Sequence, residues 1–68
     1  MQISHEIAPR PDSLGGGWRL RLLEDGVEVG GGVFPPEVTS ETSMEAALQA
    51  AFEDAESEAH AWLDSREA

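Results

Sequence analysis

Residues 18–34 read WRLRLLEDGVEVGGGVF, and this stretch decides the fold that we expect. Large apolar side chains alternate with arginines from Trp18 to Leu22, which is the pattern of a strand with one buried face. Asp25 and Gly26 then favour a two-residue turn, because a type I′ turn needs positive φ at both of its central positions. The sequence therefore predicts a β-hairpin.

The position of the turn also predicts a register. The expected pairs are Glu24 with Val27, Leu22 with Val29, Leu20 with Gly31 and Trp18 with Val33. This register gathers the large apolar residues on one face, and a slip of one residue would move them to the other. The opposite face would hold Arg19 and Arg21 across from Gly32 and Gly30, next to a small apolar patch of Leu23 and Phe34.

A shorter strand precedes the hairpin. Ile3, His5 and Ile7 alternate with polar residues, and Pro9 ends the pattern. The sequence leaves open which strand of the hairpin pairs with this segment.

A helix follows the hairpin. Thr42 and Glu45 fit a capping box, in which the N-cap hydroxyl and the glutamate each satisfy a backbone amide. Beyond them, apolar residues recur at helical spacing and form one stripe. The stripe consists of Met44, Leu48, Ala51, Phe52, Ala55, Ala59, Trp62 and Leu63.

These elements predict an α+β fold in two layers. A three-stranded antiparallel sheet within residues 1–36 packs on one C-terminal amphipathic helix over residues 42–65, in the order β-β-β-α. We expect residues 1–68 to form a single domain, because so short a chain can build only one small core. We expect a monomer rather than a dimer.

Composition narrows the classes of function. Fourteen acidic residues against four arginines and no lysine give a net charge of −10. Proteins contact nucleic acid through clusters of Lys and Arg, so we expect no direct nucleic-acid binding and favour a basic protein partner. The first residues lack the basic and apolar segments of a secretory signal, and no run approaches the ~18 apolar residues of a membrane span. We therefore expect a cytoplasmic protein that does not bind membranes.

No motif predicts catalysis or a cofactor. The glycine triplets 15–17 and 30–32 do not lie between a strand and a helix, where a phosphate loop belongs, and the second triplet favours a bulge or a close helix approach. Glu56, His60 and Asp64, with Glu53 on the same flank, have the spacing of a possible metal site, but a solvated face explains them as well. Cysteine and a Gly-x-Ser-x-Gly motif are both absent. We expect no enzyme, no cofactor and no metal.

The placement of the acids is the informative feature. Nine acids and one arginine follow residue 36, a net charge of −8. Like charges stand one helical turn apart, which destabilises a helix, and they crowd the end where the dipole prefers cations. We infer a surface that imitates the charge of a nucleic-acid backbone; solubility or a halophilic origin is the plain alternative. The predicted partner-binding residues are Glu24, Asp25, Glu28, Glu53, Asp54, Glu56, Glu58 and Asp64.

In size, charge and lack of catalytic residues, the chain resembles small acidic proteins that phages use as inhibitors, notably anti-CRISPR proteins that act as DNA mimics. The resemblance covers the full length without a shared motif, so it assigns no role to individual residues. It implies an inhibitor that covers the DNA-binding surface of a Cas effector complex in the host cytoplasm.

A second resemblance is local. Residues 18–63 are similar to HicB-type antitoxin domains, although the Gly-Asp-Thr that precedes the helix in that family is absent. The resemblance implies a β-β-β-α core and a small ribonuclease toxin as partner. The segments that carry it are Trp18-x-Leu20-x-Leu22-x-Glu24-Asp25-Gly26, Val33-Phe34-Pro35, Thr42-Ser43-Met44-Glu45-Ala46-Ala47-x-x-Ala50 and Trp62-Leu63.

Overall fold

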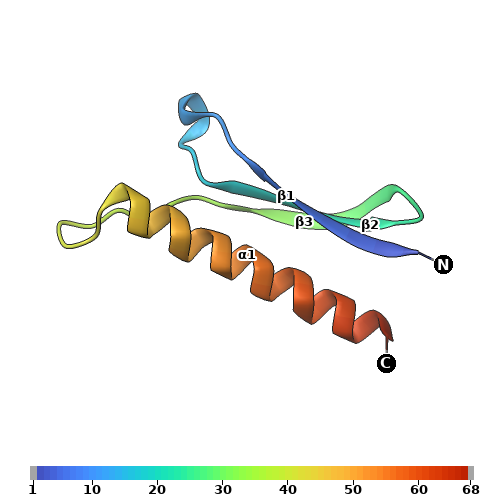
Figure 1. Cartoon of the computed structure of the whole chain (residues 1–68). Coiled ribbons are helices and arrows are strands. Elements are labelled where there is room, and N and C mark those ends of the chain that lie inside the picture. The colour runs from blue at the N-terminus through green and yellow to red at the C-terminus, as the bar shows by residue number, and fades with distance from the viewer. Residues whose placement is uncertain (1, 68) are drawn as a thin grey trace.

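Three antiparallel strands form one layer and a single helix forms the other (Figure 1). The computed structural model describes residues 2–67. The strand order is β1-β2-β3, so β1 pairs with β2, which settles the pairing that the sequence left open. The predicted α+β fold is confirmed. Its elements are β1 (Ile3–Pro9), the short 3-10 helix η1 (Asp12–Leu14), β2 (Trp18–Glu24), β3 (Val27–Phe34) and α1 (Met44–Glu67).

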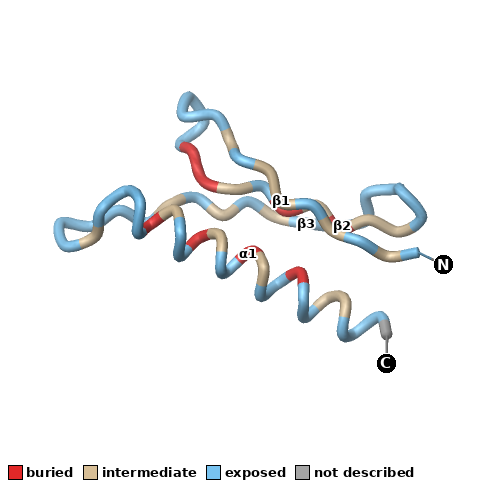
Figure 2. The backbone as a smooth tube through the Cα atoms, viewed as in Figure 1, coloured by how far each residue is buried: buried red, intermediate tan, exposed pale blue. Residues whose placement is uncertain are grey.

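The core lies between β2 and α1. Leu20 and Leu22 of β2 are buried against a helix face that presents small side chains. Figure 2 shows buried positions along the side of α1 that faces the sheet. These helix residues recur every fourth position, which keeps them on one side of α1. The buried helix residues are Ala47, Ala51, Ala55 and Ala59.

Two tryptophans border this core, as their positions in the predicted strand and stripe suggest. The Trp18 indole N–H donates a hydrogen bond to the carbonyl of Leu48 over 2.8 Å, and its ring meets the edge of Phe52 at 5.0 Å between centroids. Trp62 packs against the buried cluster near the other end of α1. The helix is therefore held to the sheet at both ends of the core.

The hairpin turn forms as predicted, but the strand register beyond it differs from the prediction. Asp25 has φ 53° and Gly26 has φ 83°, and Glu24 pairs with Val27. A β-bulge between Leu22 and Leu23 then shifts the register by one residue on β3. The observed pairs are Leu22 with Gly30, Leu20 with Gly32 and Trp18 with Phe34, so the predicted partners Val29, Gly31 and Val33 are wrong.

The bulge reverses the faces of β3 beyond it. Phe34 packs on the core instead of joining Leu23 in an apolar patch on the other face, while Val29 and Val33 are 48% and 54% exposed. On that other face Arg19 lies across from Val33 and Arg21 across from Gly31. The expected partners Gly32 and Gly30 face the helix side instead, because they now pair with the buried leucines.

Gly31 is a position within β3 that requires glycine. Its φ is +151°, and a Cβ at this position would collide with the carbonyl oxygen of Leu20 in the neighbouring strand. A Cβ on Gly30 would meet only the Leu22 Cδ1 atom at 3.6 Å, an ordinary contact. The expected close approach at this triplet is thus made by β2, and not by the helix.

The helix begins one residue later than the capping box implied. The Ser43 hydroxyl accepts a hydrogen bond from the amide of Ala46 over 3.2 Å, so Ser43 is the N-cap. The Thr42 hydroxyl instead bonds that of Thr39. Met44 is 53% exposed and does not join the buried stripe, whose first member is Ala47.

The glycine geometry gives the first testable expectation. Gly31→Ala should lower the free energy of unfolding by about 2–4 kcal/mol, because backbone must move to admit the methyl group. Gly30→Ala should raise it by about 0.5 kcal/mol, because the unfolded chain loses freedom at no native cost. Urea unfolding of the two variants measures both changes. Equal effects at the two positions would contradict the register described above.

Candidate functional site

The outer surface of α1 carries a set of acids that we call the helix acids: Glu53, Asp54, Glu56, Glu58 and Asp64. Glu53 and Asp64 project away from the sheet, opposite the buried alanines. The other three lie on the flanks of the helix, and only Glu56 is half-buried. The helix acids thus spread around the side of α1 that the sheet leaves uncovered.

All four arginines have partners elsewhere. Arg66 pairs with Glu24 over 2.7 Å, and Arg19 and Arg21 contact acids of the sheet. The Arg10 guanidinium donates hydrogen bonds to two backbone carbonyls of the connection between β1 and β2. Within residues 2–66 no ion pair reaches the helix acids, so their charge is uncompensated by the chain itself.

The three acids predicted to bind a partner at the hairpin tip, unlike the helix acids, have partners within the chain. Glu24 is bound by Arg66, and the carboxylate of Asp25 accepts a hydrogen bond from the Gln2 amide over 2.8 Å. Glu28 contacts Arg21 at 2.6 Å and Arg19 at 3.7 Å. Glu24 thus joins the sheet to the helix, whereas Asp25 and Glu28 make contacts within or beside the sheet.

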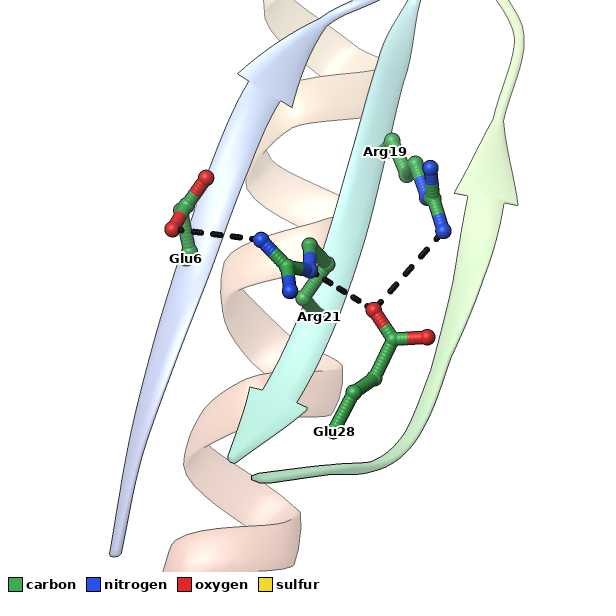
Figure 3. A network of polar contacts seen from close by, with 4 residues as sticks. All are labelled: Glu6, Arg19, Arg21 and Glu28. Carbon is green, nitrogen blue, oxygen red and sulfur yellow. Dashed lines mark hydrogen bonds and ion pairs between the residues drawn. The ribbon is translucent and has the colours of Figure 1, made fainter. Parts of the chain in front are cut away.

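Glu28 belongs to a chain of charges across all three strands (Figure 3). Arg21 of β2 lies between Glu6 of β1, at 3.7 Å, and Glu28 of β3. The four side chains, including Arg19, lie on the face of the sheet away from α1. This network gives Arg19 and Arg21 the structural role that the sequence left unassigned.

The predicted partner-binding residues therefore divide between two sides of the molecule. Glu28 lies on the outer face of the sheet, whereas Glu53 and Asp64 point away from the sheet on α1. A flat partner surface that covers the helix acids cannot also reach Glu28. The helix acids are the part of the prediction that the structure brings together.

The Arg21 hydrogen bond changes the ionisation of Glu28. It holds the pKa of the Glu28 carboxyl below its ordinary value, partly opposed by desolvation and assisted by the charge of Arg19. The same hydrogen bond, with the charges of Glu28 and Glu6, raises the pKa of Arg21. Both groups therefore favour the charged form and the closed network at neutral pH.

A groove that the sequence did not reveal lies between the end of β3 and the first half of α1. Its volume is about 460 Å³. Its walls come from the end of β3, the connection that follows it and the first half of α1. They meet only because the helix packs on the sheet, so local spacing gives no sign of the groove. The lining residues are Val33, Phe34, Pro35, Glu37, Thr39, Thr42, Ala47, Ala50, Ala51 and Asp54.

The described part of the chain bears on two further possibilities, a metal site on α1 and a membrane-spanning helix. Glu56, His60 and Asp64 share one side of α1, and the His60 ring lies 6.1 Å from that of His5. Between residues 2 and 66, however, no three His, Asp or Glu side chains converge closely enough to hold a metal ion. Across the described residues no helix combines the length and apolar character needed to cross a bilayer.

Comparisons with family models, curated proteins and solved structures find no match to this chain.

The charge network gives a second testable expectation. An NMR titration of the Glu28 carboxyl should have its midpoint below the ordinary glutamate value, and Arg21→Gln should move that midpoint upward. Because the folded pKa is lowered, the stabilisation is present at neutral pH and is lost as pH falls through that pKa. Arg10→Gln removes an equal charge outside the network and should leave the midpoint in place. Identical midpoints in the wild type and Arg21→Gln would contradict the pairing.

Proposed function

We propose that this protein is a small acidic inhibitor that binds a basic, nucleic-acid-binding surface of a protein complex by imitating DNA, as an anti-CRISPR protein does with a Cas effector. One observation carries the proposal: within residues 2–66 the helix acids have no ion-pair partner, although the arginines there pair with other acids. A fold that needed only internal charge balance would not direct Arg66, the arginine of its most acidic element, to Glu24 of the sheet. A basic partner provides the missing countercharge.

The spacing of the helix acids supports mimicry. Glu53 and Asp64 are separated by a rise of about 16 Å along α1. The five helix acids occupy the outward side and the flanks of α1, and in projection on the helix axis they average one carboxylate for roughly every 4 Å, close to the ~3.4 Å between phosphates along a DNA strand. A groove lined by Lys and Arg that accepts a phosphate backbone can therefore accept α1.

A second candidate function rests on the order of elements. The observed β-β-β-α order is the one that the resemblance to HicB-type antitoxin domains implies. In that case the basic partner is a small ribonuclease toxin, and the inhibited surface binds RNA. A toxin gene next to that of this protein, and capture of its product, would distinguish this function from the first.

Binding of a basic complex gives the third expectation. Complexes captured from host lysate on the immobilised protein should include a nucleic-acid-binding protein, should elute with salt, and should be displaced by duplex DNA. Glu53→Gln combined with Asp64→Asn should weaken binding about tenfold or more at low salt, because both carboxylates face the partner.

A matched control removes the same charge elsewhere. Asp12→Asn combined with Glu41→Gln changes two exposed acids outside α1 and should have less than about a threefold effect. Equal losses in the two double variants would show that only net charge matters. Capture that duplex DNA does not displace would contradict mimicry.

Stability measurements test the plain alternatives of solubility and halophilic adaptation, and they give the fourth expectation. We expect cooperative unfolding at about 0.1 M salt, whereas halophilic acidity requires molar salt for folding. Glu58→Gln should raise the free energy of unfolding by roughly 0.3–0.5 kcal/mol, because it removes the repulsion with Asp54 one turn away. A chain that folds only in molar salt, or is destabilised by Glu58→Gln, would support a structural role for the acidity.

A further inference from the structure

The outer edge of β3 is open to another strand. Among the described strands only β2 is a neighbour of β3, and no backbone hydrogen bond from the described turns, loops or caps involves residues 27–34. Val27, Val29 and Val33 are about half exposed or more along this strand. Natural edge strands are commonly protected by lysine, proline, a β-bulge or short length. β3 has eight residues without lysine or proline, and its bulge lies near the turn, so residues 30–34 form the open part of the edge.

The side of β3 that faces α1 is also incompletely covered. Gly30 pairs with the buried Leu22 and so faces the helix layer, yet it remains exposed. The fold does not require glycine at positions 30 and 32, because a Cβ there would make only ordinary contacts, at 3.6 Å and 3.5 Å. The missing side chains leave room beside the strand that the helix does not occupy.

The groove at the end of β3 indicates what kind of side chain fits. Its lining residues include Phe34, Pro35 and three alanines of α1. Glu37 and Asp54 are the acidic residues that line the same groove. An apolar wall with two carboxylates suits an arginine or lysine, whose aliphatic stem packs on apolar atoms while its charged end meets the acids.

We propose that the edge of β3 binds an extended basic segment of the partner protein as a fourth strand, with an arginine or lysine of that segment in the groove. Strand addition supplies main-chain hydrogen bonds, and the groove supplies side-chain specificity. The inference rests on the proposed function in one respect, the positive charge of the partner. It adds a second contact surface, formed by β3 and one flank of α1 rather than by the outward line of Glu53 and Asp64.

The net charge of the chain opposes binding of a second copy at the edge of β3. Two copies joined through β3 would bring together molecules that each carry a net charge of −10, with Asp54 of each beside the shared edge. Like charges across an interface oppose association, whereas a basic segment is attracted to the same acids.

A synthetic peptide of alternating arginine and valine tests the proposal on the full chain. In ¹⁵N NMR titrations the largest shifts should fall on the amides of residues 27–34 and on Ala50 and Ala51. Hydrogen exchange of β3 amides that have no partner in the free protein should slow when the peptide binds. The matching peptide of glutamate and valine should not bind.

Two aspartates provide matched variants. Asp54→Asn should weaken peptide binding about fivefold, because Asp54 lines the groove, whereas Asp12→Asn, the same change at an exposed aspartate outside the groove and the helix acids, should leave it unchanged. Circular dichroism should show both variants folded. Shifts confined to the helix acids, equal effects of the two variants, or binding of the acidic peptide would overturn the proposal. Self-association through β3 without peptide, detected by sedimentation, would overturn it in favour of a second copy.

The two proposals fail separately. If the peptide does not bind but the protein still captures a basic complex that duplex DNA displaces, strand addition alone is wrong. If the peptide binds at β3 and no nucleic-acid-binding complex is captured, the inhibitor function is wrong and the strand site stands.

Discussion

The close approach of α1 to β2 is the constraint on which the rest of the structure depends. The helix presents a methyl group at each of four successive turns, and Leu20 and Leu22 occupy the space beneath. This short separation lets the Trp18 indole reach the Leu48 carbonyl. Each buried methyl contributes only about 0.8 kcal/mol, so stability comes from many small contacts rather than from a few large side chains.

Close packing along β2 leaves the sides of the sheet thinly covered. The molecule measures 44 × 24 × 12 Å, and its radius of gyration of 13.3 Å exceeds the roughly 11 Å of a globular chain of this length. A single helix lying over the middle strand cannot also cover both edges. The exposed valines of β3 follow from this geometry, as does the groove beside Phe34.

Local pattern was sufficient to predict the turn at Asp25, the helix and the α+β fold, because each depends on neighbouring residues. The predicted register of β3 is wrong beyond the bulge. An alternating pattern that starts at the turn cannot detect one extra residue in a strand, and the glycines at 30–32 have no side chains that would indicate their face. The helix start was misplaced for a similar reason, since Thr42 and Ser43 are both good caps and differ only in their surroundings.

The candidate site was predictable to the extent that it lies on one element. Helical periodicity alone places Glu53 and Asp64 opposite the core. The pairing of Glu24 with Arg66 joins residues far apart in sequence, so no spacing rule reveals it. Arg21 and Glu28 were within reach of a cross-strand argument, because both are polar residues on the outer face of the predicted hairpin.

The contacts of Arg66 restrict the conformational freedom of the C-terminal end of α1. Its guanidinium pairs with Glu24 and lies 5.4 Å from the centre of the Trp62 ring, so the last turns of α1 are fastened to the end of the hairpin. Helix ends ordinarily fray, and a frayed segment must be ordered again whenever it binds. With both ends of α1 fixed, the carboxylates keep their spacing before any encounter. The basic partner that we propose would therefore meet carboxylates of fixed spacing, and its association would cost less conformational freedom than binding to a flexible acidic tail.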